Sequence, residues 1–375
     1  MTSRPTVLAS IVLTLALLGD SLLYAVLPLH ASTFGVSLAW VGVLLSANRV
    51  VRLFAYPLLP RLAALGLRRF TIAAAALSGV TTLAFAAGSG APLLLASRIA
   101  WGVVFGALSL STLAYATEWS EVAGRRVGLS LALREIGPLL SLTIGAAAVS
   151  LAGVRPTLAA LGMMSFAGVI LAMRLPELKI RNAPRRAMAL RVPVTADWLS
   201  LVAGFVTDGI FPATIALLIA GSSGAGQAVI GAGLLLGFKR IAVVVLAPPS
   251  GHAADRFGGQ IVAAAGFGIA AAGALMIAAG SVTAGAILIS CGAALTTTAI
   301  PVSIAARDAD ERVAALARAA MARDAGAAAG PLAALLWLDA AGAGVMYSAA
   351  GVLLGAMAMG LVAARHMNSP AVTER

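Results

Sequence analysis

Ionisable side chains interrupt the long apolar runs of this sequence, and they are the residues best suited to do chemistry. The acids within these runs are Asp20, Glu135, Asp208 and Asp324. The basic residues within them are Arg49, Arg52, Arg98, Arg134, Lys239, Arg240, Arg318 and Arg323. A charge at the centre of a bilayer costs about 2.5–3.5 kcal/mol on insertion scales, so each one needs a partner or a water-filled cavity. A carboxylate in such a cavity can take up and release a proton, and an excess of cations can bind an anion.

Asp20 and Asp208 lie near the middle of the first and the seventh apolar run. Intramembrane acids are functional candidates by default, so we predict that both bind a proton or the substrate, with Tyr24 lining the same cavity. The alternative is that each acid forms a structural ion pair with a cation on the next run. Asp20 would then pair with Arg49 or Arg52, and Asp208 would pair with Lys239 or Arg240.

Two further acid–base pairs are adjacent in the sequence, Arg134-Glu135 and Arg323-Asp324. Neighbouring residues on a helix point about 100° apart, so each of these side chains is predicted to bond another helix rather than its neighbour. We expect both pairs to lock helices together near a cytoplasmic gate. Direct contact with the substrate is the alternative.

The elements that must position these residues are membrane-spanning helices. Hydrophobic residues make up 61% of the 375 residues and charged residues 11%, against about 25% charged residues in a soluble domain. Spanning a bilayer takes roughly 20 apolar residues. The sequence predicts about twelve such helices, at residues 7–30, 37–59, 70–88, 91–116, 127–151, 156–173, 198–220, 227–248, 260–279, 281–304, 314–338 and 343–364. The predicted fold class is therefore an all-α integral membrane protein.

The net charge of +12 follows from membrane topology and does not indicate a nucleic-acid partner. With the N-terminus in the cytoplasm, Arg155 is the only basic residue in the outside loops, so the positive-inside rule places both termini in the cytoplasm. The basic loops are short and lack interleaved aromatic residues, which argues against nucleic-acid binding. Cys291 is the only cysteine, and the Cys and His residues lack metal-ligand spacing, so we expect neither a metal nor a cofactor.

The chain also reads as two related halves. Asp20 is echoed by Asp208, and Arg134-Glu135-Ile136-Gly137 is echoed by Arg323-Asp324-Ala325-Gly326. Both echoes have an offset of about 190 residues, which predicts two six-helix bundles related by an axis along the membrane normal. We expect them at residues 1–174 and 195–375. The basic stretch 175–194 between them is predicted to be a cytoplasmic linker, with a helix lying on lipid headgroups as an alternative.

Residues 251–260 read Gly-His-Ala-Ala-Asp-Arg-Phe-Gly-Gly-Gln and are predicted to form a tight, charged turn between two helices. This stretch resembles the G-x-x-x-D-R-x-G signature of the major facilitator superfamily, which joins helix ends there. The resemblance implies gate roles for Gly251, Asp255, Arg256 and Gly258. In the matching N-terminal loop, Ala63 and Ala64 stand where the signature has Asp-Arg.

Other motifs extend the resemblance over the whole chain. Arg98, followed by Gly102 and Gly106 on the same helix face, is similar to the family's Arg-x-x-x-Gly signature, whose Arg is associated with proton coupling. Gly137-Pro138 is similar to the Gly-Pro of proton-coupled exporters, and the second half has the same dipeptide at Gly330-Pro331. In the family these dipeptides bend helices. The resemblance implies two bundles that enclose a central cavity and rock to expose it to one side at a time.

From these observations we predict a secondary active transporter and not an enzyme, since no nucleophile–base arrangement, metal motif or nucleotide-binding loop is present. Proton-coupled export by antiport of a small organic solute is the leading expectation. Proton-coupled uptake by symport, or a membrane receptor or assembly factor without transport, is the alternative. The excess of cations within the runs favours an anionic or zwitterionic solute. We expect a monomer in the inner membrane of a bacterium, with protons, the solute and membrane lipids as its partners.

Overall fold

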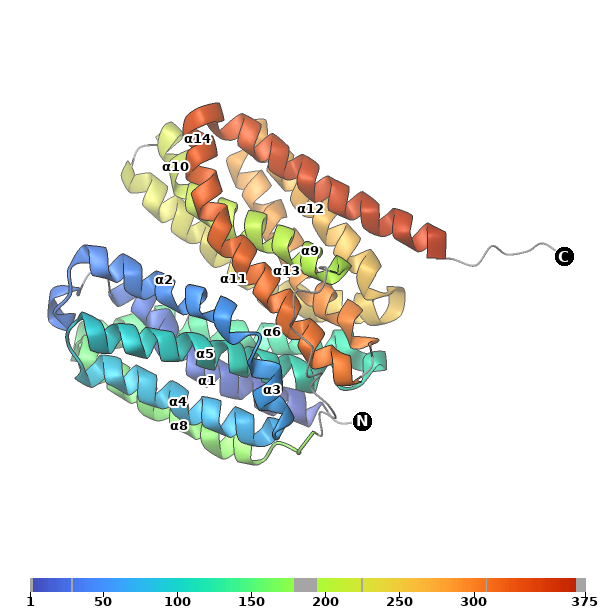
Figure 1. The fold of residues 1–375 in the computed structure, drawn as a ribbon. Helices are drawn as coiled ribbons and strands as arrows, with labels where there is room; N and C mark the ends of the chain where they lie inside the picture. Colours follow the sequence, from blue (N-terminus) through green and yellow to red (C-terminus); the bar gives the residue numbers. More distant parts are fainter. Residues whose placement is uncertain (1–2, 28–29, 179–193, 224, 308, 369–375) are drawn as a thin grey trace. The chain divides into compact units, whose positions relative to one another are not determined.

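The computed structural model describes the chain apart from short stretches. The described residues are 3–27, 30–178, 194–223, 225–307 and 309–368. Helices make up nearly all of this part, and the described residues contain no strand (Figure 1). Ten of the helices are long and apolar enough to cross a membrane. The predicted all-α membrane architecture is confirmed, whereas most of the predicted linker at 175–194 lies outside the described residues.

The N-terminal half contains eight α-helices with short connecting segments. Its α-helices are α1 (Arg4–Val26), α2 (Leu38–Ala55), α3 (Leu59–Ala64), α4 (Leu67–Ala87), α5 (Ala91–Ala116), α6 (Ala123–Leu140), α7 (Ala146–Ala152) and α8 (Val154–Met173). Two 3-10 turns, η1 (Ser32–Phe34) and η2 (Ser120–Val122), and a π-helical segment, η3 (Ser141–Gly145), complete it. The predicted fourth span at 91–116 has the same bounds as α5.

The C-terminal half consists of longer helices. They are α9 (Thr195–Ala203), the π-helical segment η4 (Gly204–Ile210), α10 (Phe211–Ser223), α11 (Ala225–Phe257), α12 (Gly259–Ala278), α13 (Val282–Ala305) and α14 (Ala309–Asn368). Gly342 breaks α14 with a φ of 77°, a conformation that only glycine adopts readily. This break separates the predicted eleventh and twelfth spans.

The predicted second and eleventh spans, which carry Arg49, Arg52 and Arg323, are helical, as α2 and the first part of α14. One prediction about these elements needs correction. The stretch 251–260 is not a turn along its length, because α11 continues to Phe257 and only Gly258, with a φ of 94°, leaves the helix. Asp255 and Arg256 therefore lie on the last turn of a helix.

The chain divides into two compact units. Unit 1 comprises Met1–Trp119, Leu129–Val192 and Arg307–Met321, and unit 2 comprises Ser120–Gly128, Pro193–Ala306 and Ala322–Arg375. Each unit thus draws mainly on one half of the chain and takes one short segment from the other. Within unit 2, α12 and α13 pack closely through glycines: a Cβ on Gly273 would lie 2.7 Å from the Gly285 carbonyl oxygen. Small residues at such contacts let helix backbones approach each other.

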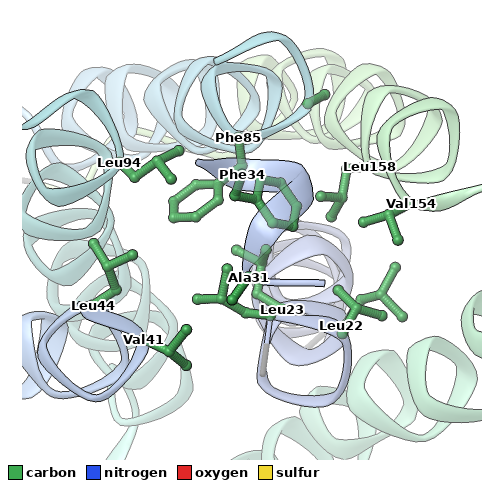
Figure 2. Packing of buried hydrophobic residues seen from close by; sticks show 13 residues of the cluster. Leu22, Leu23, Ala31, Phe34, Val41, Leu44, Phe85, Leu94, Val154 and Leu158 are labelled. Atoms are coloured by element: carbon green, nitrogen blue, oxygen red, sulfur yellow. The ribbon is translucent and has the colours of Figure 1, made fainter. Parts of the chain in front are cut away.

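In unit 1, an apolar cluster fixes the part of α1 that follows Asp20. Leu22 and Leu23 are almost fully buried there, near Phe34 of η1 and Phe85 of α4 (Figure 2). The Phe34 and Phe85 rings meet edge to face at 6.2 Å between centroids. The cluster therefore holds the helical turn beside Asp20 in a fixed orientation.

Candidate functional site

Asp20 of unit 1 forms an ion pair with Arg98, which reaches it from α5. Only 1% of the Arg98 side chain is exposed, against 12% for Asp20. The Arg98 Nε atom also donates to the Leu44 carbonyl oxygen at 3.0 Å, and its guanidinium lies over the Tyr24 ring at 5.5 Å from the centroid. A buried arginine with a carboxylate, a carbonyl and an aromatic face as partners is held in one orientation.

A small cavity of about 10 Å³ adjoins this ion pair. Asp20, Ser97, Arg98 and Trp101 are among the residues that line it. The Arg98 Nη2 and Trp101 Nε1 atoms are buried and have no hydrogen-bond partner in the structure. A space of this size has room for about one water molecule, which could accept from both donors.

The alternative considered for Asp20 was an ion pair with Arg49 or Arg52, whereas the ion pair described above joins it to Arg98. The Arg52 guanidinium lies 4.5 Å from the centroid of the Phe105 ring on α5. Tyr24, predicted to line the cavity, accepts a hydrogen bond from Asn48 at 3.3 Å and donates to the Leu45 carbonyl oxygen at 3.4 Å. We did not predict Asn48 as a site residue, although an amide within an apolar run is a polar interruption of the same kind as a charge.

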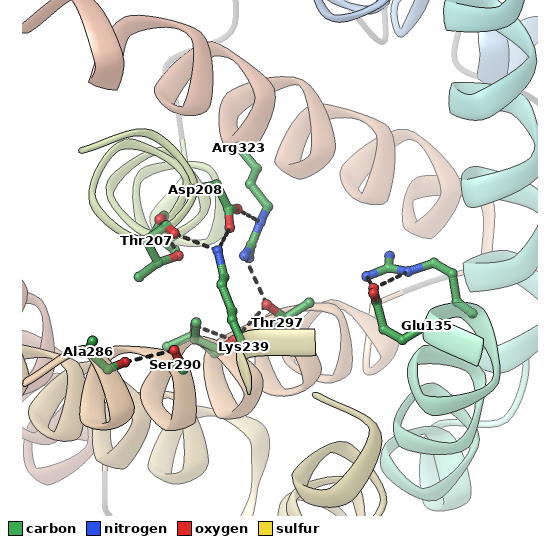
Figure 3. Close-up of polar contacts among 12 residues, drawn as sticks. Glu135, Thr207, Asp208, Lys239, Ala286, Ser290, Thr297 and Arg323 are labelled. Atoms are coloured by element: carbon green, nitrogen blue, oxygen red, sulfur yellow. Dashed lines mark hydrogen bonds and ion pairs between the residues drawn. The ribbon is translucent and has the colours of Figure 1, made fainter. Parts of the chain in front are cut away.

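Asp208 of unit 2 bridges two cations (Figure 3). One carboxylate oxygen accepts from Lys239 Nζ at 2.7 Å and the other accepts from Arg323 Nε at 2.8 Å. Lys239 also donates to the Thr207 carbonyl oxygen, and Arg323 Nη2 donates to the Thr297 hydroxyl at 2.9 Å. We call Asp208, Lys239 and Arg323 the Asp208 cluster; these three side chains are 18–25% exposed.

Close backbone packing positions this cluster. Asp208 lies in the π-helical segment η4, and such segments often occur at functional sites. A Cβ on Gly209 would lie 2.7 Å from the Gly330 Cα atom, so α14 runs directly against η4. Gly330 therefore brings the helix that carries Arg323 up to Asp208, while α11 supplies Lys239.

The predicted Asp208–Lys239 contact is present, and Arg323 joins it. We expected Arg323 to lie at a gate, but in the structure it belongs to the same cluster as Asp208. Arg240 and Asp324, also predicted as site residues, follow Lys239 and Arg323 on their helices. A prediction that Arg323 bonds another helix was correct, whereas its partner could not be identified from the sequence.

Arg134 and Glu135 bond to each other, contrary to prediction. Arg134 donates to Glu135 Oε1 from Nη2 at 3.0 Å and from Nε at 3.3 Å. The long arginine side chain spans the 100° between neighbouring positions. The corresponding pairs of the two halves therefore differ. Arg323 bonds to Asp208, whereas no contact joins Arg134 to Asp20 among the described interactions.

The predicted gate residue Asp255 caps a helix N-terminus. Its two carboxylate oxygens accept from the backbone N–H groups of Gly124 at 2.6 Å and Arg125 at 2.8 Å, in the first turn of α6. A carboxylate at this position satisfies free N–H groups and is favoured by the helix dipole. Gly251 allows this contact, because a Cβ there would collide with the Gly124 carbonyl group. The Arg256 guanidinium lies over the Phe257 ring at 5.3 Å.

The two Gly-Pro dipeptides lie at close helix contacts. A Cβ on Gly137 would lie 2.5 Å from the Thr14 carbonyl oxygen on α1, and one on Gly330 would lie 2.5 Å from the Phe205 carbonyl oxygen. Pro138 lies within α6 three residues before the π-helical segment η3, as expected where a helix loses a backbone donor. A bend at Pro331 stays a prediction. Within the described residues, no group of three His, Cys, Asp or Glu side chains could hold a metal ion.

Replacing Asp255 with alanine should impair transport while leaving expression largely intact. The change removes two charge-assisted hydrogen bonds from the start of α6, and caps of this kind contribute about 0.5–2 kcal/mol. We expect transport to fall severalfold, with a smaller loss in Asp255→Asn, whose amide oxygen can still accept one bond. The control is Ala64→Ser at the end of α3 in the matching N-terminal segment, where the side chain is partly exposed, and it should have little effect. Normal transport by Asp255→Ala would show that this cap has no part in gating.

Comparison with known proteins supports a shared fold. No protein-family model matches the sequence, and no curated protein matches it. The structure is similar to that of the human organic anion transporter MFSD10 (TETRAN), with a TM-score of 0.75, 18% identity and coverage of 96% of this chain and 99% of that one. It is also similar to FucP, a major facilitator superfamily transporter in the outward conformation, with a TM-score of 0.76, 15% identity and coverage of 96% and 99%. For the proton:xylose symporter XylE, the TM-score is 0.74 at 13% identity, with coverage of 96% and 95%.

Proposed function

Because the chain has the fold of the major facilitator superfamily, we propose that it is a secondary active transporter that moves a small organic solute by alternating access. The observation that carries this proposal is the presence of one ion-paired acid in the first membrane span of each half, Asp20 and Asp208. Ionisable groups within membrane spans are costly and therefore mark pathways for ions or substrates.

Protons are the proposed coupling ion. Both acids are bonded to side chains from other helices, so taking up a proton would break contacts between helices and could bias a conformational change. Two transporters of the same fold, FucP and XylE, are both named as proton symporters. Proton coupling in this chain would need no cofactor and no nucleotide.

The proposed solute is anionic or zwitterionic. The Asp208 cluster contains two cations against one acid, and it is partly exposed. Arginine and lysine suit carboxylate and phosphate groups, and arginine can bind them in a forked contact. MFSD10, which has the same fold, is an organic anion transporter.

The direction of transport rests on two different features. Gly137-Pro138 is similar to a signature of exporters, which favours export by proton antiport as the first candidate. The second candidate is symport, since FucP and XylE, which have the same fold, are named as proton symporters. We further propose that the halves at 1–174 and 195–375 rock about the linker at 175–194, with both termini in the cytoplasm and the protein a monomer in a bacterial inner membrane.

Flux measurements on the purified protein in liposomes test the proposed function. A pH gradient across the liposome membrane should drive uptake or release of small carboxylates but not of matched amines, and it should do so only when the protein is present. The Lys239→Gln variant should lose flux of the carboxylate selectively. The absence of pH-driven flux for every solute, or a preference for lipophilic cations, would contradict the proposal.

A further inference from the structure

Arg49 of α2 is a cation to which the described residues provide no partner. Its side chain is partly exposed, and within the described part of the chain it forms no hydrogen bond, ion pair or ring contact. It lies near the middle of the predicted span 37–59, about 15 Å from either end along a helix. Snorkelling to the lipid headgroups suits cations near helix ends, so it does not account for Arg49. This arginine therefore needs an anion from outside the chain or a water-filled cavity.

The other basic residues of the predicted spans differ from Arg49 in this respect. Four of them form the ion pairs described above. The Arg52 guanidinium lies over the Phe105 ring, and neither Arg240 nor Arg318 is without a partner. Arg49 thus stands apart from the other seven as the one cation whose counter-charge is missing from the described residues.

Arg49 lies at the edge between two faces of α2. The face that carries Leu44 and Arg52 is buried, and Leu44 packs into the apolar cluster of unit 1 (Figure 2). The face that carries Val43 and Val50 is exposed. With 100° between successive residues of a helix, Arg49 falls between these two faces. It therefore borders the exposed face without belonging to the packed core.

A groove of about 600 Å³ lies on this exposed face, between α2 and α5. Val43, Val50 and Phe54 of α2 and Ile99 of α5 are among its apolar lining residues. Ser46 is the only polar side chain among the described residues that line it. A volume of this size and a mostly apolar lining with few polar groups are typical of sites for small organic molecules.

Arg49 adjoins this groove. Residues three apart are neighbours on a helix, so Arg49 lies beside Ser46, and it directly precedes Val50 in the chain. Cations at this depth almost always face a bundle interior or a water-filled cavity, so we expect the groove to be reached by water. Its floor is fixed, because a Cβ on Gly102 of α5 would lie only 2.6 Å from the Asn48 carbonyl oxygen of α2.

We propose that Arg49 and this groove form the solute site of unit 1: Arg49 binds an anionic group of the solute, and the groove takes up an apolar body. The inference rests on the proposed function and deepens it, because it restricts the solute to organic anions with an apolar part, such as arylalkanoic carboxylates. A guanidinium binds a carboxylate in a forked contact. One solute carboxylate also neutralises the charge of Arg49, which removes the cost of an unpaired cation in the membrane.

Arg49→Gln should leave the folded protein intact, unlike the loss of a structural arginine. The change removes no contact between described residues. In the absence of solute, we expect the midpoint of thermal unfolding to stay within about 2 °C of that of the unmodified protein. A clearly lower midpoint would show that Arg49 stabilises the fold and would contradict its role as a solute-binding group.

Thiol labelling tests the site without knowledge of the solute. Ser46→Cys places a thiol in the groove, and Cys291→Ser removes the natural cysteine. The probes are two methanethiosulfonate reagents, one with a sulfonate and one with a trimethylammonium group, applied to the full-length protein in lipid nanodiscs. Both should label Ser46→Cys, because the groove is reached by water. Adding Arg49→Gln should lower the ratio of the anionic to the cationic labelling rate at least about threefold, since a nearby cation attracts the anionic reagent.

Two variants serve as controls for the labelling. Arg61→Gln removes an exposed cation of α3 in the same unit and should leave the ratio unchanged. Ile170→Cys, exposed on α8, is expected to face lipid and to react with neither reagent. Failure of both reagents to label Ser46→Cys would show that the groove faces lipid. An unchanged ratio in Arg49→Gln would show that Arg49 does not act on the groove, and either result would overturn the inference.

Protection from labelling tests the apolar part of the site. Phenylacetate at about 10 mM, enough to fill a site of millimolar affinity, should slow labelling of Ser46→Cys by the cationic reagent at least about threefold. Acetate lacks the apolar body and phenylacetamide lacks the charge, so neither should protect, and Arg49→Gln should abolish protection by phenylacetate. Equal protection by acetate would refute the apolar part of the site, and equal protection by phenylacetamide would refute the role of Arg49. No protection by any of the three would overturn the inference.

Labelling and protection need no transport, so the two proposals can fail separately. Anion-selective labelling with protection by phenylacetate, in a protein that shows no flux in liposomes, would leave the Arg49 site in place and refute the transporter. Flux of carboxylates driven by a pH gradient, without anion-selective labelling of the groove, would leave the transporter in place and refute the Arg49 site.

Discussion

Replacing Arg98 with alanine is expected to remove most of the folded protein. Arg98 is the largest fully buried side chain of the described residues, and its partner Asp20 is itself mostly buried. Removing one member of a buried ion pair leaves an uncompensated charge, which costs about 3–5 kcal/mol. The variant also loses the hydrogen bond to Leu44 and the contact with the Tyr24 ring. A loss of this size is a large fraction of the stability of an ordinary domain.

Thermal unfolding of the purified protein measures this effect. Arg98→Ala should lower the midpoint strongly or prevent purification of a monodisperse protein. Arg98→Lys should lose less, because it keeps the charge but not the planar, forked contact. The Arg52→Ala variant is a useful comparison, since Arg52 is also buried and its guanidinium lies over the Phe105 ring.

The double variant Arg98→Met/Asp20→Leu distinguishes stability from function. Removing both charges leaves no unpaired group, so this variant should recover much of the stability lost in Arg98→Ala. If Asp20 takes part in coupling, the recovered protein should still fail to accumulate solute. Full stability of Arg98→Ala would show that water reaches Asp20, and that the pair is not buried in the membrane.

The helices themselves were predictable because their signals are local. A run of about 20 apolar residues is long enough to span a bilayer, and its ends are marked by polar residues and glycines. The predicted span 91–116 therefore matches α5. Gly258, a glycine of the predicted turn, leaves the helical conformation between α11 and α12. The error at 251–257 arose because the glycines and charged residues of this stretch were taken to mark a turn. In the structure α11 continues through them, and Gly251 serves a close helix contact.

The partners of the buried acids were less predictable because they depend on packing between helices. The sequence showed that Asp20 and Asp208 need cations, but several cations were available at a similar depth. Which one reaches the acid depends on the rotation of each helix, and glycines such as Gly102 set this: a Cβ there would collide with Val51 on α2. The π-helical segment η4 adds a further change of register at Asp208 that no local pattern indicates.

Residues at equivalent positions of the two halves have different ion-pair partners. Asp20 and Asp208 are equivalent by their offset, yet Asp20 pairs with one arginine of α5 and Asp208 pairs with two cations from α11 and α14. Arg134 is the echo of Arg323 but bonds to its own neighbour Glu135. The repeat thus predicts where acids lie, whereas their chemistry has to be read from the structure.

Because the two acids have different partners, we expect Asp208→Asn to impair coupling more than Asp20→Asn. Asp208→Asn should abolish accumulation of solute against its gradient while preserving exchange of solute at equal pH on both sides. An asparagine keeps the shape of the side chain but cannot ionise, so Lys239 and Arg323 remain available to the solute without any link to protons. Asp20→Asn should reduce accumulation less, because Asp20 is the less exposed acid and its arginine is held by other contacts.

Paired assays in liposomes measure this order. Uphill uptake driven by a pH gradient reports coupling, and exchange of labelled solute at equal pH reports binding and conformational change alone. Asp208→Asn should lose at least about tenfold in the first assay and less than about threefold in the second, which corresponds to more than about 1.4 kcal/mol of lost coupling. Glu135→Gln is the control, since its charge is paired with Arg134 and has no assigned part in coupling. Accumulation by Asp208→Asn at the level of the unmodified protein would show that another group carries the proton. Loss of exchange together with accumulation would show that Asp208 is needed for solute binding itself.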